Sequence, residues 1–259
     1  MNPMDAAVAA VAGRSRVAIL LDFDGTLSPL APHPDLSTLP EATAAVLQRL
    51  AARALVGIVS GRSLQNIRHM VGIEGLVYAG GHGLNILHRD GTTYDYPLPD
   101  GAVETVQALK QKLQRLCRDG AWIEDKGGQL TFHYREVPSN LHEYFASEAI
   151  AVVQASGLKV GLAHSAIEAK PVVQWHKGAA CLKILGHEWG ENWSSDDSAV
   201  IYAGDDTTDE DAFKSLNDSG LTIRVTSSGN VPTAAQLKVP SVGALLQVLE
   251  AVADQLESE

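Results

Sequence analysis

RVAILLDFDG, residues 16–25, is a continuous apolar run that ends in two acids and a glycine. A strand buried on both faces of a parallel sheet has this pattern, with its polar end at the carboxyl edge of the sheet. A helical stretch follows at about 40–52, and a second apolar run, LVGIVSGR, occupies residues 55–62. A strand, a helix and a strand with short connections predict a right-handed crossover in an open α/β sheet.

The same rhythm recurs towards the C-terminus. SAVIYAGDD at 198–206 reads as another buried strand, a helix is expected from about Asp209, and LTIRV at 221–225 reads as the next strand. In sheets of this kind, ligands bind beyond the carboxyl ends of the strands. We therefore expect the polar residues that follow these strands to converge on one site: Asp22, Asp24, Ser60, Asp205 and Asp209.

The middle of the chain has a different rhythm. A helix is expected at about 102–119, a hairpin around Gly127-Gly128, a second helix at about 139–156, and two more strands in LKVGLAH (158–164) and AIEAKP (166–171). This αββαββ order predicts an α+β cap domain at 102–170. The cap would be inserted into an open parallel-sheet, Rossmann-like α/β core formed by residues 1–101 and 171–259.

The charge balance limits the partners. The net charge is −11, with 31 acids against 20 bases. Nucleic acids and anionic membrane surfaces recruit basic patches, so neither is expected as a partner. The apolar run Ala6–Gly13 is short and follows Asp5, unlike a signal peptide or a membrane span. We expect a cytoplasmic protein whose two cysteines, Cys117 and Cys181, are buried thiols rather than a disulfide or metal ligands.

DFDGTLSPL, residues 22–30, carries the first chemical signal. Asp22 and Asp24 are two residues apart at a strand end, so their side chains point the same way, and Gly25 permits a sharp turn. Aspartate and glycine also occur in ordinary turns after strands. Two carboxylates in one small site repel each other, however, and a hard divalent cation compensates that repulsion.

GDDTTDEDAF, residues 204–213, carries the second signal. Acids are favoured at the start of a helix by its dipole, which accounts for part of this cluster but not for Asp205 at the strand end. Glu210 and Asp211 are expected to be solvated helix-start residues rather than metal ligands. Mg²⁺ prefers oxygen ligands and keeps several waters. Its expected ligands are the Asp22 carboxylate, the Asp24 backbone carbonyl and the Asp205 carboxylate, with Asp209 close by.

Two further segments supply groups that suit a phosphate. In SGR, residues 60–62, a hydroxyl and backbone amides stand at a strand end and helix start, which is a suitable anion site. In WHKGAACLKIL, residues 175–185, Lys177 stands at the start of a helix. A lone lysine at a helix start is usually a surface residue. Lys177 is therefore a candidate phosphate ligand only because the other motifs are also present.

Taken in order, DxDGT, a strand ending in Ser60, Lys177 and GDDxxD resemble the haloacid dehalogenase-type phosphatase superfamily. The resemblance implies that Asp22 is the nucleophile and that Asp24 is the general acid, then the base. It also implies that Ser60 and Lys177 hold the phosphoryl oxygens, while Asp205 and Asp209 secure Mg²⁺. A carboxylate is a weak nucleophile towards an anionic phosphate, so neutralising charge is needed as the phosphoryl group moves.

A closer resemblance spans about residues 21–213. LDFDGTLSPL, IVSGR, GHG, IEDKGGQLTFHYR, IEAKPVVQWHKG and IYAGDDTTDEDAF together resemble trehalose-6-phosphate phosphatases. The family implies a small-molecule sugar phosphate as substrate, and charged side chains near sugar hydroxyls are physically apt for binding it. A solvated hairpin face is the alternative for the cap residues. The expected substrate-binding set is Gly61, Arg62, His82, Gly83, Glu124, Lys126, Arg135, Glu168 and Lys170.

Three positions depart from the family pattern and bear on sugar preference. Lys170 stands where the family usually has arginine, which keeps the charge but loses the planar fork. His176 stands where aspartate is common, and a surface histidine at a helix start is the expectation for it. Gly81 replaces the common serine or asparagine.

Other functions stay open at this point. A related sugar phosphatase acting on glucosylglycerol phosphate or sucrose phosphate would use the same core residues. An inactive, sugar-phosphate-sensing domain would be expected to lack Asp22 or Asp24, yet both are present. A phosphoglucomutase-type cap is generally helical, unlike the strand-rich one expected here. Whether a trehalose-phosphate synthase partner binds is not readable from the sequence. The amphipathic segment at about 242–256 is expected to pack on the core.

Overall fold

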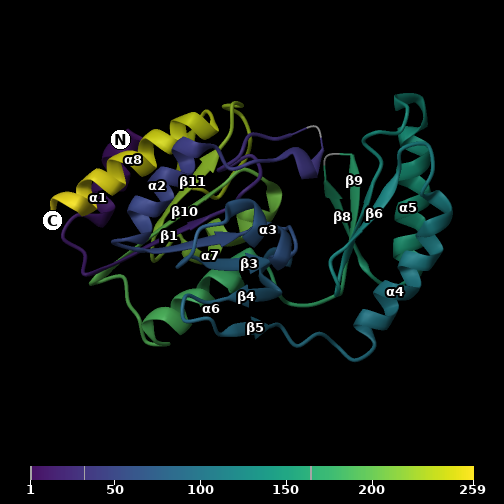
Figure 1. Cartoon of the computed structure of the whole chain (residues 1–259), viewed down its shortest axis with the longest axis horizontal. Helices are drawn as coiled ribbons and strands as arrows, with labels where there is room; N and C mark the ends of the chain where they lie inside the picture. The colour runs from purple at the N-terminus through teal and green to yellow at the C-terminus, as the bar shows by residue number, and fades with distance from the viewer. Residues whose placement is uncertain (1, 32, 164) are drawn as a thin grey trace. The chain divides into compact units, whose positions relative to one another are not determined.

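The computed structural model describes residues 2–31, 33–163 and 165–259. The chain forms two compact units, the first from Met1–Tyr96 with Trp175–Glu259 and the second from Pro97–Gln174 (Figure 1). The second unit is therefore an insertion in the first. The insertion predicted at 102–170 is shorter than this second unit. The segments at 97–101 and 171–174 carry no helical or strand periodicity that would assign them to the core or to the insertion.

The first unit is built on an eight-stranded sheet with the order β12-β11-β10-β1-β2-β3-β4-β5. The strands from β12 to β3 pair in parallel, and β4 and β5 extend the sheet as antiparallel strands. Their bounds are β1 Arg16–Leu21, β2 Leu55–Val59, β3 Val77–Gly80, β4 Asn85–Leu87, β5 Thr93–Asp95, β10 Ser198–Gly204, β11 Leu221–Val225 and β12 Leu237–Val239.

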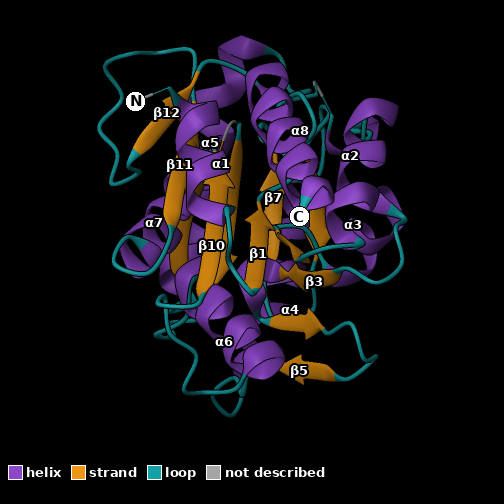
Figure 2. Cartoon of the chain, turned by 90° about the vertical axis from the view of Figure 1, so that its left-hand side faces the viewer, coloured by secondary structure: helices purple, strands orange, loops and turns teal. Residues whose placement is uncertain are grey.

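Helices cover both faces of this sheet (Figure 2). Val17, Ile19 and Leu21 of β1 pack in one core with α1, α2, α3 and α8, whereas Ala18 and Leu20 pack in the other with α6 and α7. A strand buried on both sides has to be apolar throughout, which explains the unbroken run. The helix bounds are α1 Pro3–Val11, α2 Glu41–Ala51, α3 Leu64–Val71, α6 Lys177–Trp189, α7 Glu210–Leu216 and α8 Val242–Ser258.

The second unit is a four-stranded antiparallel sheet, order β6-β7-β9-β8, with two helices packed on one face. Phe132, Ile167 and Ala169 point into that core, and their sequence neighbours point away from it. The bounds are α4 Ala102–Leu113, β6 Trp122–Asp125, β7 Leu130–His133, α5 His142–Ala155, β8 Lys159–Ala163 and β9 Ala166–Lys170. The structure confirms the predicted fold class, an α/β core with an αββαββ insertion; His164, placed in a predicted strand, lies outside the described residues.

Some elements carried too little sequence signal to be assigned. The strands β3, β4 and β5 are only three or four residues long, and α1 begins before the apolar run Ala6–Gly13. Ala7 and Val11 of α1 are fully buried in the same core as α8, which packs on the core as expected. Cys181 is buried and Cys117 half-buried, and both are free thiols. Every helix within the described residues is too short or too polar to cross a membrane.

Candidate active site

Three adjacent strands end at one group of polar side chains. Asp22 follows β1, Ser60 follows β2 and Asp205 follows β10, and these strands are neighbours in the sheet. One carboxylate oxygen from each of Asp22, Asp205 and Asp209 lies within 4.8 Å of the others. The parallel order therefore brings the acids together, as the sequence predicts.

Asp22 is buried and ion-paired. Its Oδ1 accepts a hydrogen bond from Lys177 Nζ at 2.7 Å, and the exposed fraction of Asp22 is 5%. Burial raises the pKa of the Asp22 carboxyl well above its ordinary value, the Lys177 ammonium opposes that rise, and the carboxylates of Asp209 and Asp205 add to it. Burial and the Asp209 carboxylate likewise raise the pKa of Asp205, to about 7. The three carboxylates of Asp22, Asp205 and Asp209 thus carry more negative charge than the Lys177 ammonium balances.

The turn after β1 depends on Gly25. Its φ is +77°, which favours glycine, and its N–H donates to the Ser28 carbonyl at 2.8 Å. A β-carbon on residue 25 would lie 2.2 Å from Oδ2 of Asp205. Gly25 therefore serves both the turn and the close approach of the β1 loop to the Asp205 carboxylate.

Asp209 is fully buried and accepts four hydrogen bonds. Its Oδ1 accepts from Tyr202 Oη at 2.6 Å and from Lys177 Nζ at 2.8 Å, and its Oδ2 accepts from the backbone amides of Asp205 at 3.0 Å and Asp206 at 2.8 Å. A carboxylate offers about four lone-pair sites, so this one is satisfied by the protein alone. Asp209 orients Lys177 and fixes the loop that carries Asp205.

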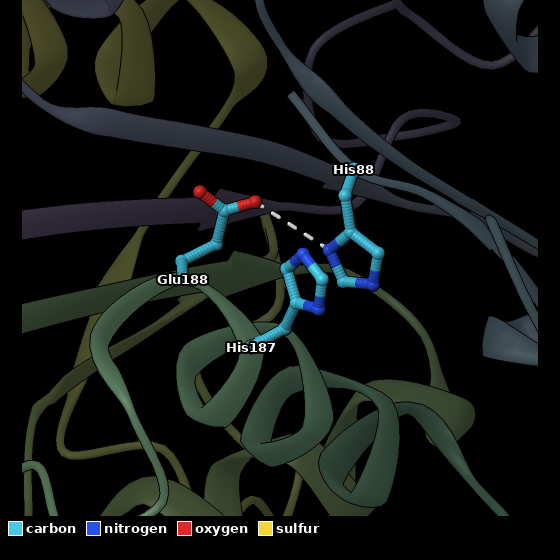
Figure 3. A group of neighbouring side chains, drawn as sticks. All are labelled: His88, His187 and Glu188. Atoms are coloured by element: carbon cyan, nitrogen blue, oxygen red, sulfur yellow. Dashed lines mark ion pairs between the residues drawn. The ribbon is translucent and has the colours of Figure 1, made fainter. Parts of the chain in front are cut away.

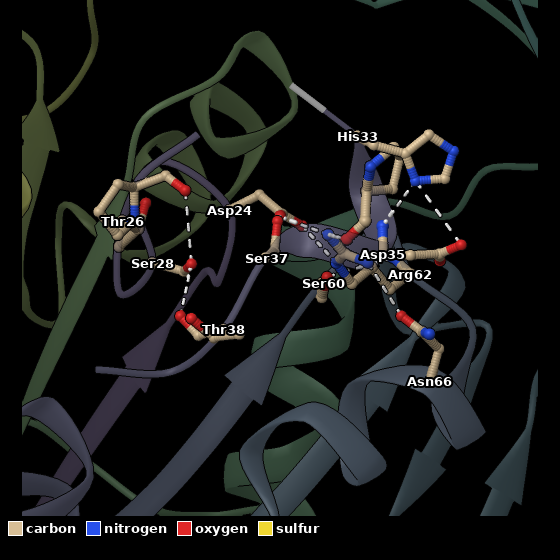
Figure 4. Close-up of polar contacts among 12 residues, drawn as sticks. Asp24, Thr26, Ser28, His33, Asp35, Ser37, Thr38, Ser60, Arg62 and Asn66 are labelled. Atoms are coloured by element: carbon tan, nitrogen blue, oxygen red, sulfur yellow. Dashed lines mark hydrogen bonds and ion pairs between the residues drawn. The ribbon is translucent and has the colours of Figure 1, made fainter. Parts of the chain in front are cut away.

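Asp24 is held by an arginine (Figure 4). Its Oδ2 accepts from Arg62 Nε and its Oδ1 from Arg62 Nη2, both at 2.6 Å, and Ser37 Oγ donates to Oδ1 at 3.1 Å. Arg62 also donates to Asn66 Oδ1 and to the Pro34 carbonyl. The arginine predicted to bind substrate is thus engaged with the predicted acid–base residue.

The Ser60–Arg62 loop is tied to the GHG segment. His82 N–H donates to the Ser60 carbonyl at 2.8 Å, and Gly81 N–H donates to the Arg62 carbonyl at 2.7 Å. A β-carbon on Gly61 would lie 2.7 Å from the His82 ring. A β-carbon on Gly83 would similarly lie 2.1 Å from Cβ of Ala180 in α6. The two glycines predicted to bind substrate thus have a packing reason to be glycine.

Helix α6 places Lys177 through its cap. His176 Nδ1 accepts from Ala179 N–H at 3.2 Å, so this half-buried histidine is the N-cap, a role that the family's aspartate would also suit. Lys177, the first helical residue, has an exposed fraction of 2%. Burial lowers the pKa of Lys177, but the carboxylates of Asp209 and Asp22 raise it by a larger amount, so the net shift is upward.

One expectation about this region is wrong. Glu210 is not a solvated residue, because its Oε1 accepts from Arg224 at 2.7 Å and its Oε2 from Ala234 N–H at 2.7 Å. The pair links the start of α7 to β11 and to the loop before β12.

In the second unit, the sheet face away from its helices carries the predicted sugar ligands. Glu124, Thr131 and Glu168 lie side by side on β6, β7 and β9. Lys170 Nζ lies 2.6 Å from Oε2 of Glu168, and a β-carbon on Gly161 would lie 2.9 Å from the same oxygen. The register therefore gathers acids and a lysine on one face.

Glu124 has two basic neighbours there. Its Oε2 lies 3.1 Å from His133 Nε2 and 3.4 Å from Lys126 Nζ. Burial raises the pKa of Glu124, but His133 and Lys126 outweigh it and the net shift is downward. Arg135 is half-buried two residues beyond the end of β7.

Sequence reasoning missed three residues that support these groups. Tyr202 donates to Asp209 from within β10, and His133 contacts Glu124 while stacking on Trp122 at a centroid distance of 4.1 Å. For His133 and Trp122 the signal was present, since a polar or aromatic residue at every second position of a cap strand marks the face opposite the core. Nothing local distinguishes Tyr202 from the other core residues of its strand.

Comparison with known proteins agrees with these features. The chain is 34% identical to a trehalose-phosphate phosphatase of Mycobacterium ulcerans over 94% of this chain and 63% of that protein. It is 33% identical to the one of Mycobacterium tuberculosis over 92% of this chain and 62% of that protein. The chain thus spans less than two thirds of the curated relatives it matches.

A solved structure, the C-terminal domain of Candida albicans trehalose-6-phosphate phosphatase, has the same fold. Its TM-score is 0.82 at 20% identity, covering 97% of this chain and 96% of that one. The family model described as trehalose-phosphatase matches residues 20–242, which include both strand-end acid motifs and the whole insertion. The chain therefore belongs to the trehalose-phosphatase family.

Proposed function

We propose that this chain hydrolyses trehalose 6-phosphate to trehalose and phosphate through a phosphorylated Asp22. The observation that carries the proposal is the environment of the Asp22 carboxylate. It is buried beside Asp205 and 2.7 Å from the Lys177 ammonium, at the edge of the sheet where ligands of such folds bind. Family membership supports the reaction class and the sugar.

The acidic group fits Mg²⁺. Its donors are all carboxylate oxygens, and the pKa values of Asp22 and Asp205 are raised first by burial and then by the neighbouring carboxylates, both of which a cation would offset. We assign the Asp22 and Asp205 carboxylates and the Asp24 carbonyl as the protein ligands of the ion. Since Asp209 already accepts four hydrogen bonds, we give it a supporting role instead of a direct bond. When bound, Mg²⁺ supplies positive charge against the phosphoryl oxygens.

In the first step, an Asp22 oxygen attacks phosphorus and the bond from phosphorus to the sugar oxygen breaks. Lys177 neutralises phosphoryl charge, and Ser60 donates a hydrogen bond to a phosphoryl oxygen. Asp24 delivers a proton to the departing sugar oxygen. Since Asp24 accepts two hydrogen bonds from Arg62, it has to leave the guanidinium before it can carry that proton.

In the second step, water attacks the phosphorus of the phosphorylated Asp22. Asp24, now ionised, accepts a proton from that water, and the Asp22 carboxylate is regained with release of phosphate. The Arg62 fork is the natural partner of the ionised Asp24. We therefore propose that Arg62 alternates between Asp24 and the substrate, in keeping with its predicted role in substrate binding.

For the sugar, we propose the polar face of the second unit. Glu124, Glu168, Lys126, Lys170 and Arg135 would hydrogen-bond the disaccharide hydroxyls, and the insertion would act as a cap that closes during turnover. Lys170 in place of arginine would offer a point charge there without the planar two-point fork. Gly61, His82 and Gly83 would shape the wall of the phosphate site. A cytoplasmic location, and the lack of nucleic-acid or membrane partners, stay predictions from composition.

Phosphate release from a panel of sugar phosphates, with and without Mg²⁺, tests the proposal. The panel holds trehalose 6-phosphate, sucrose 6-phosphate, glucosylglycerol phosphate and glucose 6-phosphate. Preference for trehalose 6-phosphate with a requirement for Mg²⁺ is expected. Activity centred on another sugar would keep the assignment of the core residues and reject that of the cap residues. Release from none of them would support a sensing domain instead.

A further inference from the structure

A second cluster of metal-type ligands lies in the first unit, where β4 and α6 meet (Figure 3). His88 is the residue after β4, and His187 and Glu188 are in the last turn of α6. One ligand atom from each residue lies within 4.8 Å of the others. The proposed phosphatase mechanism uses none of the three.

Two atoms of this cluster are buried without a hydrogen bond. Among the described residues, His88 Nδ1 and Glu188 Oε1 have no hydrogen-bonding partner, and they face each other as an ion pair at 3.4 Å. The exposed side-chain fractions are 2% for His88 and 7% for Glu188. Buried polar atoms are rarely left unsatisfied, so this pair calls for a third atom between them.

One nitrogen of each histidine ring lies on the side of Glu188, as Figure 3 shows. The rings of His88 and His187 stack with centroids 3.6 Å apart and planes 21° apart.

We propose that His88, His187 and Glu188 bind one divalent transition-metal ion of the Zn²⁺ class. Two imidazole nitrogens with one carboxylate are a donor set typical of Zn²⁺, whereas Mg²⁺ takes oxygen ligands. Ligands placed tetrahedrally at a zinc–nitrogen distance of about 2.0–2.1 Å lie about 3.3–3.4 Å apart. The 3.4 Å between His88 Nδ1 and Glu188 Oε1 matches that spacing.

The neighbouring charges favour a divalent cation. Arg89 binds the other carboxylate oxygen of Glu188, Oε2, at 2.8 Å, which leaves Oε1 for the metal. Asp90 Oδ2 lies 3.3 Å from His187 Nε2, on the partly exposed side, and offers a fourth ligand. The two carboxylates and one guanidinium leave a net negative charge for the ion to balance.

This site is separate from the phosphatase site. Lys177 is the first residue of α6 and His187 stands ten residues later, which is about 15 Å along a helix. The ion would join the end of α6 to the β4–β5 hairpin, at the edge of the sheet. Its role is to clamp the helix that presents Lys177, and its effect should appear as stability.

Calorimetric titration of the full-length protein with Zn²⁺ tests the site, after chelation and in excess Mg²⁺ to occupy the catalytic acids. We expect one Zn²⁺ per chain and a rise in Tm on binding. Co²⁺ in place of Zn²⁺ should give the visible absorption of a four-coordinate site. His187→Ala changes a partly exposed residue and should weaken binding at least about tenfold.

His69→Ala, which removes an exposed histidine of α3, is the matched control and should bind as the wild type does. Glu188→Gln, close in shape to the wild type, gives a second variant should circular dichroism show that His187→Ala misfolds. The proposal is wrong if the wild type binds no Zn²⁺ in excess Mg²⁺, or if a folded variant binds it as tightly as the wild type. Neither result depends on phosphatase activity.

Discussion

The guanidinium of Arg62 holds the carboxylate of Asp24 in a two-point fork, with both nitrogen–oxygen distances at 2.6 Å. The arginine is almost fully buried, and its Cζ lies 5.6 Å from the centre of the Phe23 ring. Such bidentate pairs are among the stronger hydrogen-bonded contacts in proteins. In the proposed mechanism, the fork sets the orientation of Asp24 between its two proton transfers.

Arg62→Ala should therefore lower kcat for trehalose 6-phosphate by about 10–100-fold, because the ionised Asp24 loses the partner that orients it as the general base of the second step. p-Nitrophenyl phosphate passes through the same second step, so its kcat should fall as well. Asp24→Asn should also slow both substrates, and trehalose 6-phosphate by the larger factor, because the nitrophenolate leaving group needs no proton. An unchanged kcat with a raised KM on both substrates in Arg62→Ala would mean that Arg62 serves phosphate binding alone.

Asp22→Asn should reduce phosphate release more than about a thousandfold, since an amide is a far weaker nucleophile than a carboxylate. The amide has the same shape, and Lys177 keeps its 2.8 Å contact with Asp209, so the fold should persist. Steady-state phosphate release and circular dichroism measure the two effects. Near-normal turnover in this variant would remove Asp22 from the nucleophile role.

The core of this site could be predicted because its signals are local. Asp22 and Asp205 each follow an unbroken apolar strand, and parallel strands end at one edge of a sheet. The pairing of Asp24 with Arg62 could not be predicted from the sequence, because it joins residues 38 positions apart through a loop geometry that no periodicity encodes. Hydrogen bonds between side chains depend on tertiary placement, which pattern alone does not give.

The same limit applies to Asp209. Its motif predicts a metal ligand, but the number of donors around it is a property of the packed structure. Tyr202, seven residues earlier on β10, reaches the same carboxylate as Lys177 of α6. The predicted bounds of the insertion differ from those of the second unit for a simpler reason, since its two connecting segments have no periodicity.

The stability gained from Mg²⁺ should increase with pH. The pKa values of Asp22 and Asp205 are raised in the folded protein, so between about pH 4 and pH 7 the metal-free folded state binds more protons than the unfolded chain. The free energy of unfolding contributed by these groups therefore falls as pH rises. Mg²⁺ needs both carboxylates ionised, so its binding reverses that loss and strengthens with pH.

Thermal unfolding with and without Mg²⁺ at pH 5.5 and pH 7.5 measures this effect. The Mg²⁺-induced rise in Tm should be at least about 2 °C larger at the higher pH. Asp205→Asn removes one of the two acids and should abolish most of the rise at both pH values. An effect of Mg²⁺ that is equal at both pH values in the wild type would contradict the assignment of these ligands.

Gly25→Ala should abolish Mg²⁺-dependent activity. The new methyl group would lie 2.2 Å from Oδ2 of Asp205 and displace a proposed metal ligand, and the positive φ adds about 1–2 kcal/mol of strain. Gly13→Ala is the matched control, because Gly13 has a φ of +67° but open space around its β-carbon position. Both variants should lose stability, and only Gly25→Ala should lose Mg²⁺ binding, measured by titration calorimetry. Equal Mg²⁺ affinity in the two would refute the steric argument.

The polar face of the second unit should contribute to sugar binding and not to phosphoryl transfer. Glu124→Ala removes a carboxylate that lies beside Thr131 and contacts His133 and Lys126, so it should raise the KM for trehalose 6-phosphate about 10-fold or more. p-Nitrophenyl phosphate has no sugar hydroxyls, and its kcat/KM should change little.

Asp125→Ala is the control for this face. Asp125 is the next residue of β6, points to the opposite side, and pairs with Lys110 of α4 at the surface. It should leave both substrates nearly unaffected, since exposed ion pairs contribute little. If Glu124→Ala lowers kcat/KM equally for the disaccharide and the small ester, the residue supports folding or catalysis. If instead Asp125→Ala raises the KM for the disaccharide as much as Glu124→Ala does, and leaves the small ester unaffected, then sugar binding does not depend on one face of the sheet. That result would contradict the proposed binding face.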